Sequence, residues 1–122
     1  AKKSAASFRI PAEAYQGGDK EKLRQMVVSR WKALYPQDQI VLVRFVKPSW
    51  ERRRETTYNN GSFYHYDNSA LLVYVVIKKS AELGTAYPVY VNRDNQTGKL
   101  EVGAQTKGSG YSHQDVLLKN VH

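Results

Sequence analysis

With 122 residues, 41% of them hydrophobic, the chain is long enough to fold as one domain around one core. The absence of cysteine excludes disulfide scaffolds, thiolate nucleophiles and cysteine-ligated zinc, and no apolar run is long enough to span a bilayer. The formal net charge of +8 is uneven, with +5 over residues 1–35, +3 over residues 36–79 and zero over residues 80–122. This balance favours acidic partners such as nucleic acid, anionic lipid, glycan or an acidic protein, and solubility alone explains it as readily.

The two ends of the chain are expected to lie outside the main elements. Residues 1–18 form an N-terminal arm with one short strand around residues 8–10, and residues 107–122 form a loop and a flexible tail. Because the chain begins at Ala1 without methionine, we expect a bacterial protein that is periplasmic or secreted and has lost its signal peptide. A cytoplasmic location stays open.

Residues 19–34 have the pattern of one amphipathic helix. Asp19 is a suitable N-cap, and Pro36 ends the helix because proline cannot continue the hydrogen-bond ladder. Arg30 falls inside the apolar stripe, so either its stem runs past Trp31 to solvent, or it points into a concavity between helix and sheet and binds an acid or an anionic ligand. The residues of the stripe recur at three- and four-residue intervals: Leu23, Met26, Val27, Trp31 and Leu34.

From residue 39 onward, a periodicity of two and many β-branched and aromatic residues predict an antiparallel sheet. The expected strands cover residues 39–47, 50–58, 62–66 continuing through 70–79 after a kink at 67–69, 85–92 and 99–106, with a turn at 82–84. Asn60 and Gly61 predict a tight hairpin turn because both tolerate positive φ, and Pro48 marks an edge or a bend. Two sets of alternating residues are each expected to share a face: Val41, Val43 and Phe45, and Val73, Val75 and Ile77.

Together these elements predict an α+β fold, in which one long N-terminal amphipathic helix packs on a four- to five-stranded antiparallel meander. The order of elements resembles that of the cystatin-like and nuclear-transport-factor-like folds over most of the chain. Residues 39–43 read Gln-Ile-Val-Leu-Val and lack the Gln-x-Val-x-Gly motif of the cystatins. The resemblance therefore concerns the fold and implies no protease inhibition.

Two pairs of residues have a spacing that catalysis can use. His65 and Asp67 stand two apart on a predicted strand, as a general base and its orienting carboxylate would, and His113 and Asp115 repeat this spacing. Neither pair has further ligands at metal-binding spacing, and no nucleophile elbow, nucleotide-binding loop or cofactor motif occurs. We expect no enzyme, no metal and no cofactor, and a small enzyme using His65 and Asp67 is a remote alternative.

Basic and aromatic residues gather around the second predicted strand. Arg52 and Arg54 point to one side of it and Arg53 to the other. Charges on an edge strand commonly prevent edge-to-edge aggregation, whereas in a binding surface they contact phosphate or sulfate while aromatic rings stack. The candidate binding residues are Arg30, Lys47, Trp50, Arg52, Arg54, Tyr64, Tyr66 and Lys78, with Tyr58, Phe63 and Lys79 nearby.

The sequence thus predicts a non-enzymatic binding or accessory module that engages a protein or polyanionic partner through a basic sheet face or the helix–sheet cleft. The alternative is a nucleic-acid-binding domain that uses Arg52 and Arg54 with their aromatic neighbours. One basic stripe with exposed aromatic rings favours nucleic acid, and scattered basic residues favour the first hypothesis.

Overall fold

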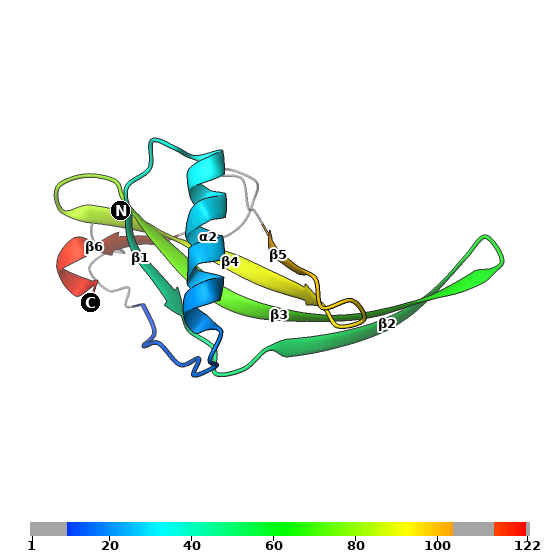
Figure 1. The fold of residues 1–122 in the computed structure, drawn as a ribbon. Helices are drawn as coiled ribbons and strands as arrows, with labels where there is room; N and C mark the ends of the chain where they lie inside the picture. The colour runs from blue at the N-terminus through cyan, green and yellow to red at the C-terminus, as the bar shows by residue number, and fades with distance from the viewer. Residues whose placement is uncertain (1–9, 104–113, 122) are drawn as a thin grey trace.

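The computed structural model describes residues 10–103 and 114–121. In this part of the chain one α-helix packs on a six-stranded antiparallel open sheet, so the predicted α+β class is confirmed (Figure 1). A single turn of 3₁₀ helix, Leu118–Asn120, follows the last strand. The elements are, in chain order, α2 (Lys20–Leu34), β1 (Ile40–Phe45), β2 (Glu51–Asn59), β3 (Ser62–Lys78), β4 (Leu83–Asp94), β5 (Leu100–Gly103) and β6 (Gln114–Leu117).

Helix α2 buries the predicted stripe against one face of the sheet. Leu23, Val27 and Trp31 are buried, while the flanking Met26 and Leu34 are only partly covered. The helix ends before Pro36, as predicted. Asp19 occupies the cap position without a capping hydrogen bond, because its carboxylate instead accepts a 2.6 Å hydrogen bond from the Tyr15 hydroxyl.

The sheet has β3 and β4 at its centre, and on each side of this pair two shorter strands lie end to end. β1 and β2 both pair antiparallel with β3, β1 with the stretch that ends at Ile77 and β2 with the stretch that begins at Ser62. β5 and β6 pair in the same end-to-end manner with β4. Pro48 lies in the break between β1 and β2, as expected for a residue that cannot donate to a ladder. The six strands exceed the predicted four or five because β6 forms in the expected tail.

Three details of the predicted strands are wrong. β3 runs for 17 residues without the kink expected at 67–69, because β2 pairs with it continuously up to Ala70. Val41 is 41% exposed and does not share the buried face of Val43 and Phe45, because the register with β3 shifts between Ile40 and Leu42. β4 begins at Leu83, inside the turn expected at 82–84. Three predictions lie partly outside the described residues: the short strand around residues 8–10, the end of the strand expected at 99–106, and the start of the loop and tail expected at 107–122.

The core lies between α2 and the sheet. Val73, Val75 and Ile77 all belong to it, which confirms the predicted face of the central strand. Leu72, Tyr74 and Val76 alternate with them and point to the opposite face. A smaller second cluster forms there around Val76, together with Ile10, Ala86 and Val116.

Beyond the body, β2 and β3 continue as a two-stranded arm (Figure 1). We define the arm as β2 together with residues 62–67 of β3. Asn68 is the first residue of β3 that pairs with β4, so among the described residues no third strand lies beside residues 62–67. Asn60 and Gly61 have φ values of 52° and 81°, which is the type I′ geometry that the Asn-Gly pair predicts.

Candidate binding site

The register of the arm assigns its side chains to two faces, since residues directly opposite in an antiparallel pair lie on the same side. The face shared with the helix carries Arg52, Arg54, Thr56 and Tyr58 from β2 and Phe63, His65 and Asp67 from β3. The other face carries Glu51, Arg53, Glu55 and Thr57 from β2 and Tyr64, Tyr66 and Asn68 from β3. Every residue of β2 is exposed.

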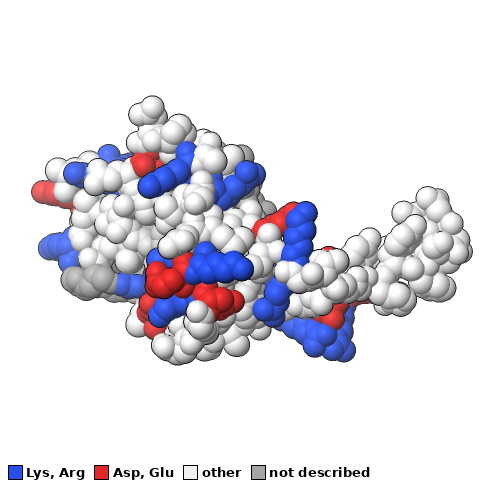
Figure 2. Space-filling view, viewed as in Figure 1, with Lys and Arg blue, Asp and Glu red and all other residues white. Residues whose placement is uncertain are grey.

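The outer part of the arm, residues 56–66, is aromatic and uncharged. It contains no Lys, Arg, Asp or Glu, in a chain where 25% of the residues are charged. Four aromatic rings remain exposed there: Tyr58 at 64%, Phe63 at 68%, Tyr64 at 46% and Tyr66 at 48%. Figure 2 shows the end of the arm without acidic or basic atoms, whereas both signs gather where the arm meets the body. We call residues 56–66 the arm tip.

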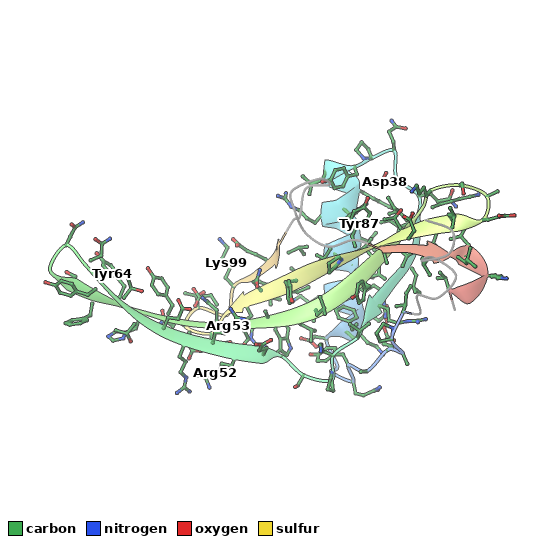
Figure 3. All side chains as sticks on the ribbon, turned by 180° about the vertical axis from the view of Figure 1, so that it is seen from behind. Asp38, Arg52, Arg53, Tyr64, Tyr87 and Lys99 are labelled. Atoms are coloured by element: carbon green, nitrogen blue, oxygen red, sulfur yellow. The ribbon has the colours of Figure 1, made fainter. Side chains whose placement is uncertain are left out.

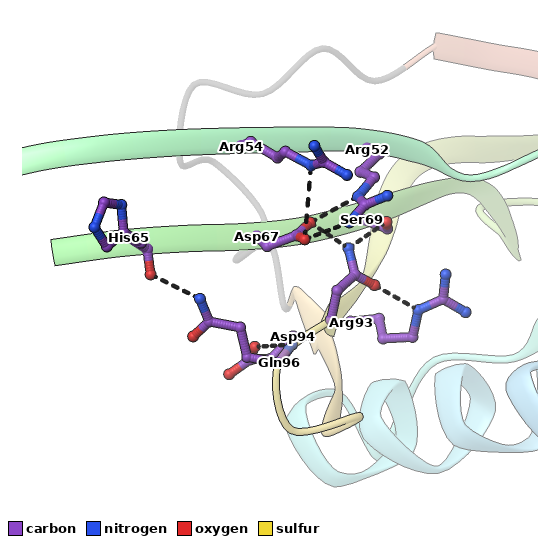
Figure 4. Close-up of polar contacts among 9 residues, drawn as sticks. Arg52, Arg54, His65, Asp67, Ser69, Arg93, Asp94 and Gln96 are labelled. Carbon is purple, nitrogen blue, oxygen red and sulfur yellow. Dashed lines mark hydrogen bonds and ion pairs between the residues drawn. The ribbon is translucent and has the colours of Figure 1, made fainter.

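Asp67 organises the opposite end of the arm, where it joins the body. Its carboxylate accepts two hydrogen bonds from Arg52, at 2.8 Å from Nε and 2.5 Å from a terminal nitrogen, and lies 3.8 Å from Arg54 (Figure 4). Asn95 donates a further 2.9 Å bond from its side-chain amide to Asp67. The hydrogen bonds from Arg52 and Asn95 hold the pKa of Asp67 well below its usual range.

The contacts of Asp67 continue into the body through Asn95. The Asn95 side chain also donates to the buried Ser69 and accepts a 3.0 Å bond from Arg93. The Arg93 guanidinium lies 4.4 Å from the centre of the Trp50 ring, a cation–π contact.

Trp50 carries the same chain of contacts to the start of the helix. Its indole donates a 3.1 Å bond to the Tyr15 hydroxyl, which in turn donates to Asp19. Tyr15 is buried, and burial raises the pKa of its hydroxyl. The contacts from Asp67 to Asp19 therefore tie the arm to β4, to the helix and to the core.

The turn between β4 and β5 supports the arm from its β3 side. The backbone N–H of Asn95 donates to the Asp67 carbonyl at 2.8 Å. The Gln96 side chain donates to the His65 carbonyl at 2.9 Å (Figure 4). The Asp94 carboxylate in turn accepts a bond from the Gln96 backbone N–H. This turn thus prolongs the support of β4 past its last paired residue.

A hollow of about 500 Å³ lies on the other face, where the arm joins the sheet. Charged and aromatic side chains line it together, among them Arg53, Glu55, Tyr66 and Tyr90. Tyr66 belongs both to this hollow and to the arm tip.

The structure brings together only part of the predicted basic surface. Arg52 and Arg54 flank Asp67 (Figure 4). By the register, Tyr64 and Tyr66 lie on the opposite face of the arm from them. Tyr64 lies toward the end of the arm and Arg52 nearer to the body (Figure 3). Trp50 is partly buried beneath Arg93 and is an anchor of the arm.

The other predicted basic residues lie apart from Arg52 and Arg54. Lys47 is exposed in the connection before β2. Lys78 lies at the far end of β3, eleven residues beyond Asp67, or about 37 Å along the strand. Arg30 is exposed and borders an open hollow between α2 and β5, which Lys22 and Glu101 also line.

The residues considered for catalysis have other partners. His65 lies with Nδ1 3.0 Å from the Thr56 hydroxyl, and Asp67 is held by Arg52 and Asn95. Asp115 forms an ion pair with Lys79 and accepts a bond from Thr85, and His113 lies outside the described residues. Among residues 10–103 and 114–121, no three His, Asp or Glu side chains gather as metal ligands would.

Arg93, Asn95 and Gln96 were not identified from the sequence as part of a site. Residues 94–98 read Asp-Asn-Gln-Thr-Gly, a composition that favours a turn. Asn95 contacts Asp67 across 28 residues, and Gln96 contacts His65 across 31 residues. No local sequence pattern indicates contacts between residues so far apart.

Comparisons with protein-family models, with curated proteins and with solved structures gave no match to this chain. Over the described residues, no helix has the length and apolar character needed to cross a membrane.

Proposed function

We propose that the protein is a non-enzymatic binding module that engages a protein partner through the tip of its β2–β3 arm. The observation that carries this proposal is the exposure of four aromatic rings on an extended arm whose outer eleven residues are uncharged. Protein interfaces are enriched in Tyr and Phe and depleted of Lys, Glu and Asp at their centres. Exposed aromatic clusters on a folded domain commonly mark such interfaces.

The composition of the tip supports a protein partner further. Between Tyr58 and Tyr64 the chain reads Tyr-Asn-Asn-Gly-Ser-Phe-Tyr. Antibody binding loops are rich in the same residue types, because Tyr provides large contact area at low entropic cost and Ser, Gly and Asn provide adaptable hydrogen bonds.

Nucleic acid is the less favoured partner, because the arginines of the arm already have acidic partners. Arg52 and Arg54 share Asp67, and Arg53 lies 3.7 Å from Glu51. Phosphate binding would require some of these pairs to open, and Arg53, which lines the same hollow as Tyr66 of the tip, is one of the paired arginines. The basic residues are scattered, which was the feature expected of a protein-binding module.

The fold and location of this module are also proposals. An arrangement of the cystatin-like or nuclear-transport-factor-like kind agrees with the single helix across an antiparallel meander. Export to the periplasm or the medium is a proposal with which the lack of cysteine agrees. The helix–sheet hollow beside Arg30 is the second surface on which an acidic partner would fit.

The test is site-specific photo-crosslinking in cells that produce the protein. The photoreactive amino acid p-benzoylphenylalanine at Phe63 should give a defined protein adduct, because this ring is the most exposed of the tip. The same group at Lys32, exposed on the outer side of α2, is the matched control and should give none. Equal adducts at both positions would contradict the proposal.

A short-arm variant separates loss of the site from loss of the fold. Removing residues 56–59 and 62–65 joins Glu55 to Tyr66 through Asn60 and Gly61, and these two flanking residues are already directly opposite. The variant should keep the thermal stability of the body and should bind no partner. Labelled single-stranded oligonucleotide provides the contrast: binding that falls steeply with salt and that Arg52→Ala with Arg54→Ala weakens would favour the nucleic-acid alternative.

A further inference from the structure

The outer edge of β2 is an unpaired strand edge. The turn at Asn60 and Gly61 closes on the pair Asn59–Ser62, so in a type I′ hairpin these two residues hydrogen-bond to each other. Because bonding alternates along an antiparallel strand, residues 52, 54, 56 and 58 direct their backbone N–H and C=O away from β3. Within the described residues no backbone hydrogen bond reaches these groups.

The other edge of the arm is protected. Asp67 and His65 direct their carbonyls away from β2 by the same alternation, and these are the carbonyls that Asn95 and Gln96 cover. At the body, the edge of β1 is partly covered as well, since the Ala14 N–H donates to the Phe45 carbonyl at 2.9 Å. β2 therefore offers the longest uncovered edge of the described sheet.

We propose that the β2 edge pairs antiparallel with the β2 edge of a second copy of this chain, around a two-fold axis through Thr56. This inference rests on the proposed role of the arm as a binding element, and it adds the backbone edge to the aromatic faces. In a two-fold contact the unpaired backbone N–H and C=O groups of each β2 edge bond to those of the other copy. Both free edges are then paired at once.

The charges of β2 disfavour two of the other registers, and a register centred on Thr57 places Arg54 opposite Asn60, beyond the end of the strand, so that it forms fewer backbone hydrogen bonds. A two-fold axis through Arg54 places two arginines directly opposite, and an axis through Glu55 places two glutamates opposite, both of which are unfavourable. An axis through Thr56 places Thr56 opposite its copy and Arg54 opposite Tyr58 of the second copy. The guanidinium then meets an aromatic ring, and about six backbone hydrogen bonds form.

The charged residues at the start of β2, residues 51–53, explain why the proposed pairing does not extend along the whole strand. Residues 51–53 carry Glu51, Arg52 and Arg53, of which Arg52 is fixed on Asp67. Charges of this kind prevent an edge from pairing without limit. In the Thr56-centred register, backbone hydrogen bonds join only residues 54–58 of the two copies. The two-fold contact leaves no further edge for a third copy, so the assembly ends at a dimer.

Cysteine crosslinking tests the register, since the chain has no cysteine of its own. At the two-fold axis a hydrogen-bonded pair has its Cα atoms about 5.5 Å apart, within the range that a disulfide spans. Thr56→Cys should form a disulfide-linked dimer on mild oxidation. Thr57→Cys faces residue 55 of the second copy, and Lys32→Cys reports random collision, so both should remain monomeric. Crosslinking of Thr56→Cys no faster than that of Lys32→Cys would overturn the proposal.

Sedimentation of the full chain tests the association without a crosslink. Thr56→Pro removes an outward N–H and leaves the pairing with β3 intact, because proline is tolerated at that position of an edge strand. It should weaken self-association at least about tenfold, whereas Thr56→Ser should not. A wild-type chain that stays monomeric at high concentration overturns the dimer. The partner-binding proposal would survive that outcome, because photo-crosslinking from Phe63 to a different protein does not depend on the edge.

Discussion

At the scale of single residues, burial and charge pairing decide what each side chain does. Val75 and Val41 are the same residue type on paired strands, yet Val75 is fully buried and Val41 is 41% exposed because it lies in the register shift of β1. Arg52 and Lys47 are both basic, yet among residues 10–103 and 114–121 only Arg52 of the two has a carboxylate partner. Residue type alone predicted the core face of β3 correctly and overestimated the number of free arginines.

Asp67 should make the stability of the folded protein depend on pH in the acidic range. The carboxylate has a folded-state pKa below the ordinary value of about 3.9, so its stabilisation is complete above that value and is lost as the pH falls through the folded-state pKa. Asp67→Asn should therefore lower the urea midpoint at pH 7, and the gap to wild type should narrow below about pH 4.

The matched control for this prediction is Glu55→Gln, which removes an exposed carboxylate from the same arm. It should leave the urea midpoint at pH 7 unchanged. A gap between wild type and Asp67→Asn that stays constant from pH 7 to low pH would show that the charge of Asp67 has no part in holding the arm.

At the scale of elements, the arm is a hairpin without a core of its own. Two-stranded hairpins are marginal in water, so the arm depends on the tight turn at one end and on the contacts of Asp67 at the other. The sequence predicted the turn, since Asn-Gly chemistry is local. It placed a kink at 67–69 where none exists, because Asp, Asn and Ser favour turns locally while the ladder with β2 and β4 keeps β3 extended.

Replacing the turn glycine should loosen the arm and leave the body unaffected. Gly61 has a φ of 81°, a conformation that costs other L-residues about 1–2 kcal/mol. Gly61→Ala should therefore speed amide hydrogen exchange about 5- to 30-fold at the N–H groups that bond across the hairpin, those of residues 55, 57, 64 and 66, with exchange at Val73 and Val75 unchanged. Gly18→Ala, at a site with open space, is the control. Uniform acceleration across the sheet would mean that the arm and the body unfold as one unit.

At the scale of the whole molecule, the arm makes the protein elongated (Figure 1). Residues 62–67 alone extend about 20 Å past the last pairing with β4, at about 3.4 Å per residue. The helix, the two hydrophobic clusters and the β4–β5 turn form the base from which the arm projects. A long arm on a small body gives a partner access to both of its faces and to its free edge.

Small-angle scattering checks this shape. A compact chain of 122 residues has a radius of gyration of about 14 Å. The monomer, measured at low concentration, should exceed that value, and the short-arm variant should return close to it. Equal radii for the two proteins would show that the arm lies folded back on the body in solution.

The sequence by itself determined the local features: the helix with its buried stripe, the type I′ turn, the alternating core of β3 and the uncharged aromatic run of residues 56–66. Each of these depends on neighbours within a few positions, where periodicity and turn chemistry act. Only the tertiary structure decided that Asp67 gathers Arg52, Arg54 and Asn95, that Trp50 anchors the arm, and that β2 is left with a free edge. Those outcomes depend on which strands lie side by side, and pairing across 15 to 30 residues is set by the packing of the whole sheet and not by any short segment.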